Sequence, residues 1–152
     1  MIGHGAERWV QAASASDRAD ALAFVARAAR MNEAAVIRLQ GRPDGRLGLW
    51  THTGFDVLAT RSIVGGSAPA DIVCDAEQLR TVLAVADAGT RVDPGFTFAS
   101  AWKGALPPAS GYVHVDDVPA RSVVELARSG AKLARTEGSA HGPATGLLDQ
   151  VV

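Results

Sequence analysis

The sequence predicts a single α+β domain in which an antiparallel β-meander of three to five strands is covered by about three α-helices. Apolar residues recur at helical spacing in three segments. In the stretch between the first and the second of these segments, apolar and polar residues alternate, as they do in β-strands. Turn-forming residues divide the alternating stretch. A chain of 152 residues with 47% apolar residues can bury one core without a disulfide or a metal. We place this domain at residues 1–136.

The first helix is expected between residues 17 and 31. Two pairs, Ser14 with Asp17 and Asp17 with Asp20, stand three residues apart, as in a capping box, before an apolar stripe that includes Val25. Residues 35–40 then alternate between apolar and polar, which predicts a strand with one solvated face. The following GRPDG sequence favours a tight turn and predicts a hairpin with residues 47–51.

A second turn at Thr53 and Gly54 adds residues 55–60 and extends the hairpin to a three-stranded meander. His52 and Asp56 are expected on its polar face. The glycine-rich residues 65–69 predict a loop, and residues 70–74 predict a fourth strand. Cys74 is the single cysteine, and its apolar neighbours indicate a buried, unreactive thiol.

Two further helices follow. Asp75 is expected to cap the N-terminus of the second helix, and Gly89 is expected to end it. Asp116 or Asp117 caps the third, with Pro119 in its first turn, and Gly130 either ends that helix or marks a close packing contact. The apolar stripe of the third helix comprises Val123, Leu126, Ala127 and Leu133.

The C-terminal residues differ in composition from the rest of the chain. Residues 137–146 read EGSAHGPATG, which is typical of a flexible linker. Residues 147–152 begin a new apolar run, LLDQVV. We expect this run to pair as an edge strand or to start a region that continues beyond it.

An aromatic and proline-bearing segment lies between the second and third helices. It carries Trp102, Lys103, Tyr112 and His114, and irregular segments on a rigid scaffold commonly hold function. We interpret these four residues as a surface that recognises a protein partner or a second copy of the chain. The alternative interpretation is that the aromatic side chains pack as satellite core at the edge of the sheet.

Two other function classes stay open. Lys103, His114 and Asp116 would form the pocket of a small-molecule enzyme if they converged on one cavity. A nucleic-acid-associated, clamp-like module would use four arginines of the first helix and the hairpin, although a solvated face is the simpler interpretation of a chain with a net charge of -1. These arginines are Arg27, Arg30, Arg42 and Arg46.

Standard site signatures are missing from the sequence: it has no phosphate-binding GxxxxGK, no dinucleotide-binding GxGxxG, no HExxH, no paired CxxC and no GxSxG. We therefore lean towards a function that is not enzymatic and expect neither a cofactor nor a metal. A single cysteine and the lack of a secretory signal or long apolar run predict a cytoplasmic protein without a membrane partner.

Four short motifs carry a family resemblance. They are WKGALPP at residues 102–108, GY at 111–112, DVPA at 117–120 and LLD at 147–149. In these motifs the chain resembles a family of uncharacterised proteins from high-GC Gram-positive bacteria. The resemblance implies no activity and no role for any residue, and it implies that the family's members continue past this point.

Overall fold

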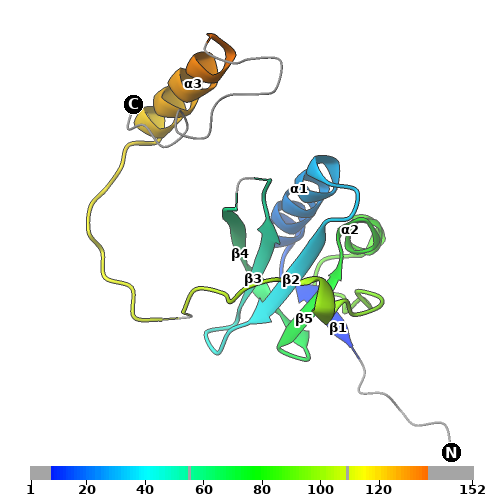
Figure 1. The fold of residues 1–152 in the computed structure, drawn as a ribbon. Coiled ribbons are helices and arrows are strands. Elements are labelled where there is room, and N and C mark those ends of the chain that lie inside the picture. The colour runs from blue at the N-terminus through cyan, green and yellow to red at the C-terminus, as the bar shows by residue number, and fades with distance from the viewer. Residues whose placement is uncertain (1–7, 55, 109, 137–152) are drawn as a thin grey trace, which may run out of the picture. The chain divides into compact units, whose positions relative to one another are not determined.

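A computed structural model describes residues 8–54, 56–108 and 110–136 (Figure 1). Its contacts divide the chain into two compact units, Met1–Ala109 and Ser110–Val152. The predicted boundary at residue 136 and the predictions for residues 137–146 and 147–152 fall outside the described residues. The expected domain over residues 1–136 spans the division between the two units and stays a prediction.

The first unit contains a five-stranded antiparallel sheet with the strand order β1-β4-β3-β2-β5 (Figure 1). Two α-helices follow the first and the last strand along the chain. The class is the predicted α+β fold. The elements are β1 (Trp9–Ala12), α1 (Ala15–Met31), β2 (Val36–Gly41), β3 (Arg46–His52), β4 (Leu58–Ala68), β5 (Asp71–Asp75) and α2 (Ala76–Val85).

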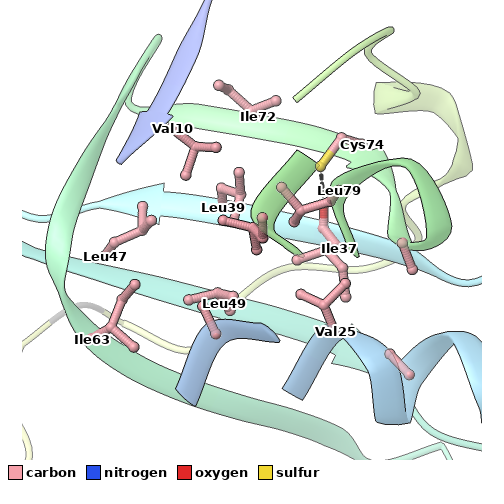
Figure 2. Close-up of a cluster of buried hydrophobic side chains, with 14 of the residues drawn as sticks. Val10, Val25, Ile37, Leu39, Leu47, Leu49, Ile63, Ile72, Cys74 and Leu79 are labelled. Atoms are coloured by element: carbon pink, nitrogen blue, oxygen red, sulfur yellow. Dashed lines mark hydrogen bonds between the residues drawn. The ribbon is translucent and has the colours of Figure 1, made fainter. Parts of the chain in front are cut away.

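The core lies between one face of the sheet and the two helices, because alternate strand residues point to that face. Figure 2 shows Val25 of α1 and Leu79 of α2 beside the inward side chains of the strands. Burial of each large aliphatic side chain contributes roughly 1.5–3 kcal/mol. The buried strand residues include Ile37, Leu39, Leu47, Leu49, Ile63 and Ile72.

Of the two caps predicted for the first helix, the structure shows Ser14, and the cap predicted for the second helix is confirmed. The Ser14 hydroxyl accepts from the backbone N–H of Asp17 at 3.1 Å, and the Asp17 carboxylate accepts from the N–H of Val64 at 2.8 Å. The second bond ties the start of α1 to β4. The Asp75 carboxylate accepts from the N–H of Gln78 at 2.7 Å and satisfies a donor in the first turn of α2.

The loop predicted at residues 65–69 is wrong over most of its length, because β4 runs to Ala68 and pairs there with β1. The sequence pattern did not predict β1. Glycine at position 65 is what permits this pairing. A Cβ atom on Gly65 would stand 2.2 Å from the carbonyl oxygen of Gln11, so only glycine lets the two backbones approach.

The second unit contains α3 (Ala120–Thr136), which runs through Gly130 without ending there. Neither predicted carboxylate caps it in the described residues. Asp117 pairs with His114 at 2.9 Å, and Asp116 accepts from the N–H of Asp117 at 2.7 Å. No helix among the described residues is both long and apolar enough to cross a bilayer.

Candidate functional site

Trp102 is carried to the sheet by a segment that runs along the free edge of β5. The N–H of Phe98 donates to the carbonyl of Val73 at 2.8 Å, and Thr97 forms an isolated bridge with Cys74. A short 3-10 helix, η1 (Ala99–Ala101), then leads directly to Trp102. The segment covers a strand edge that would otherwise expose unpaired backbone groups.

Trp102 packs on the sheet face opposite the helices. Its exposed fraction is 9%, and its ring centroid lies 4.5 Å from that of His52. The guanidinium of Arg38 lies 5.6 Å from the Trp102 centroid and donates to both carboxylate oxygens of Asp71, at 2.8 and 2.6 Å. This hydrogen bonding raises the pKa of Arg38 above its ordinary value. Trp102 therefore has the contacts of satellite core.

Lys103 lines a cavity of about 350 Å³ next to this cluster. The cavity also includes His52 from the end of β3 and Asp56 from the turn between β3 and β4. Sequence reasoning placed His52 and Asp56 only on a polar hairpin face and missed their proximity to Lys103. No local signal predicts it, because the cavity forms where the chain crosses from β5 back to β3.

Tyr112 and His114 belong to the second unit. Tyr112 is 71% exposed, and the His114 ring is hydrogen-bonded to Asp117. The four residues predicted as one recognition surface are thus divided between two units. The same division applies to the enzyme pocket, since Lys103 lies in the first unit while His114 and Asp116 lie in the second. Both groupings stay predictions.

The arginines of the clamp-like alternative also separate. Arg27 and Arg30 line a groove between α1 and α2 together with Arg80, which sequence reasoning did not select. Arg42 instead forms an ion pair with Asp44 at 3.4 Å. Arg46 donates to the Ser62 hydroxyl at 2.9 Å. Both residues are exposed strand residues next to buried ones, so their side chains lie on the sheet face away from the core.

Helix α3 presents an unusually clean division between apolar and charged sides. With 3.6 residues per turn, Val123 and Leu126 fall on one side, and the basic residues fall on the other. Val123, Val124 and Leu126 are 54%, 45% and 51% exposed, and no residue of α3 is buried. The basic residues are Arg121, Arg128, Lys132 and Arg135.

The described residues were compared with the requirements of a metal site and of a reactive thiol. Within it, no group of three His, Cys, Asp or Glu side chains could hold a metal ion. Cys74 is fully buried, and burial raises the pKa of its thiol to about 12. The thiolate is the reactive form, so Cys74 is inert in the folded protein, as the sequence predicts.

Two family models match the chain. One, described as "Domain of unknown function (DUF8010)", matches residues 5–104, and "Domain of unknown function (DUF8185)" matches residues 107–152. The two matches meet close to the division between the compact units at residue 109. Searches of curated proteins and of solved structures find no match.

Proposed function

We propose that this chain, which belongs to the DUF8010 family, is a protein-interaction module that associates with a second copy of itself through α3. The exposed apolar side of α3 is the observation that carries the proposal. Helices in proteins owe most of their stability to the packing of an amphipathic face rather than to intrinsic helix propensity. A partner that covers Val123 and Leu126 supplies that packing.

The spacing of the apolar residues suits pairing with another helix. Val123, Leu126, Gly130 and Leu133 follow the alternating three- and four-residue steps of a coiled-coil seam. Ala127 and Ala134 flank this seam and are small, so two helices can approach closely. The exposed ring of Tyr112, in the same unit as α3, offers additional apolar area to a partner.

The charges of α3 favour a second copy as the occupant. The four basic residues of α3 lie on the side away from the seam, so pairing two copies does not bring like charges together. Gly130 in the seam and the flanking Ala127 and Ala134 bury little apolar area against lipid, which favours a helix partner over a membrane surface.

Sedimentation of the full chain tests this proposal. We expect a dimer that Leu126→Asp converts to a monomer, because the new carboxylate would be buried in the seam. Ala131→Asp is the matched control, since it adds the same charge on the side away from the seam, and it should remain dimeric. A wild-type chain that is monomeric at its highest soluble concentration contradicts the proposal. Equal dissociation of both variants contradicts it as well.

The groove between α1 and α2 supports a second candidate function, binding of nucleic acid. Arg27 and Arg30 line this groove and form no ion pair with another described residue, while Arg80 pairs with Glu77 at 2.5 Å. Guanidinium groups in such an arrangement can meet successive phosphates. The groove lies on the helix side of the sheet and does not include Arg42 or Arg46.

A salt titration of binding to duplex DNA tests this candidate. Arg27→Ala should weaken binding and reduce the salt slope by about one for each lost phosphate contact. Arg42→Ala is the matched control and should bind like the wild type, because Arg42 is paired with Asp44 outside the groove. No binding at low salt removes nucleic acid as a partner.

A further inference from the structure

The cavity beside Trp102 is built from three separate parts of the chain. Asn32 closes the C-terminal end of α1, and His52 and Asp56 flank the turn after β3. Lys103 follows η1. Ala34, Ala35, Val36 and Ala101 provide an apolar wall. A volume of about 350 Å³ falls within the range of natural small-molecule sites.

Two opposite charges face this cavity without pairing. Asp56 and Lys103 make no ion pair and no hydrogen bond with each other or with any other described residue. Elsewhere in the first unit, the carboxylates of Asp20, Asp44 and Asp71 each hold an arginine. Asp56 has a φ of 55°, in the left-handed region that aspartate tolerates better than most residues. The turn thus keeps an unpaired carboxylate at the cavity.

Two neighbouring groups are already held in place. The Asn32 side-chain oxygen accepts from the N–H of Ala34 at 2.9 Å, so its amide NH₂ is the part left to donate. The ring of His52 is fixed against Trp102, at a centroid distance of 4.5 Å. Groups that are positioned before a ligand arrives lose less conformational entropy on binding.

We propose that this cavity binds a small zwitterionic ligand of the amino-acid type. The ligand's carboxylate meets the ammonium of Lys103 and the amide NH₂ of Asn32, and its amino group meets the carboxylate of Asp56. A simple anion would be repelled by Asp56 and a simple cation by Lys103, whereas a zwitterion offers each group its opposite charge. The apolar wall accommodates the ligand's side chain.

This site is independent of α3 and of the groove between α1 and α2. The test is titration of the ¹⁵N-labelled full chain with each protein amino acid, followed by NMR. For every amino acid that shifts the resonances of Asn32, His52 and Lys103, its deaminated and decarboxylated analogues are titrated in parallel. We expect both analogues to bind about tenfold more weakly, since each lacks one charge-assisted hydrogen bond.

Two substitutions identify the charged groups. Asp56→Asn removes the charge and keeps a residue that tolerates positive φ, and Lys103→Met keeps the length of the side chain. Each should raise the dissociation constant about tenfold. Asp44→Asn and Lys132→Met are the matched controls outside the cavity and should leave binding unchanged. The proposal is overturned if no amino acid shifts these resonances, if a deaminated analogue binds as well as its parent, or if the controls weaken binding equally.

Discussion

Two helices of equal length behave differently in the two units. Both α1 and α3 have 17 residues and an apolar side. Helix α1 buries Ala21, Val25 and Ala28 against a sheet, whereas α3 buries no side chain. An amphipathic pattern therefore establishes that a helix has a face to cover, and it does not establish what covers that face. The first unit supplies its own cover, and we propose that a second copy supplies it for α3.

The largest expected effect separates a core leucine from an exposed one. Leu39→Ala should reduce the free energy of unfolding of the first unit by about 3 to 5 kcal/mol, because Leu39 is fully buried and the vacated volume cannot collapse. Leu126→Ala, in α3, should leave that value unchanged. Urea unfolding followed by tryptophan fluorescence measures it, since Trp9, Trp50 and Trp102 all lie in the first unit.

An equal loss in both variants would show that the two units unfold together. The comparison between them would then fail, because α3 would be part of the same cooperative structure as the sheet.

A second comparison concerns the two aromatic residues that sequence reasoning grouped together. Trp102→Ala should destabilise the first unit by about 3 kcal/mol, because it removes a buried ring from His52 and Arg38. Tyr112→Ala should change that stability by less than about 0.5 kcal/mol, because its ring is exposed. Thermal unfolding followed by circular dichroism compares the two variants. A near-neutral Trp102→Ala would instead support recognition by this ring.

Two glycines provide a comparison of opposite sign. Gly65→Ala should destabilise the first unit by about 2 kcal/mol, because the added methyl group collides with the backbone of β1. Gly130→Ala, made in the Leu126→Asp background so that no second copy covers the seam, should stabilise α3 by about 1 kcal/mol, since open space surrounds this helical position in the single chain. Hydrogen exchange of the amides of β1 and of α3 resolves the two effects. Unchanged protection in β1 would mean that its pairing with β4 does not depend on Gly65.

The sequence predicted the elements whose signals are local. Ser14 and Asp75 cap the first two helices as expected, and the alternation of β2 and β3 marked the meander. Strand β1 has no such signal, because it pairs with Gly65 and Gly66, which have low strand propensity and lie far along the chain. Long-range pairing of this kind appears only in the folded structure.

In the candidate sites, too, features with a local signal could be predicted from the sequence, and contacts between distant segments could not. Burial of Cys74 could be predicted from its apolar neighbours, and it is confirmed. The grouping of Lys103 with His52 and Asp56 could not be predicted. The chain leaves the sheet edge at β5, and η1 leads it back past β2 to the end of β3, where Lys103 meets the other two residues. Arg80 was not predicted as part of the arginine cluster for the same reason, since it lies near Arg27 only when α1 packs beside α2.

The smallest expected effect is a pH dependence confined to the first unit. Hydrogen bonds from the Ser14 hydroxyl and from the N–H of Val64 lower the pKa of Asp17 below its ordinary value of 3.8. A carboxyl group with a lower pKa in the folded state stabilises the protein above its unfolded pKa, and that contribution is lost as the pH falls through the folded pKa. Because Asp17 is only half-buried and its charge is screened by solvent, the contribution is at most about 1 kcal/mol.

Asp17→Asn tests this dependence. At neutral pH the variant should unfold at a lower urea concentration than the wild type, and the difference should shrink as the pH falls below 3.8. Asp116→Asn is the matched control in the second unit, where the carboxylate only accepts from the neighbouring N–H, and it should leave the tryptophan-detected transition unchanged. If the Asp17→Asn difference were constant across this range, the Asp17 charge would not stabilise the junction between α1 and β4, and the cap would act through its neutral hydrogen bonds alone.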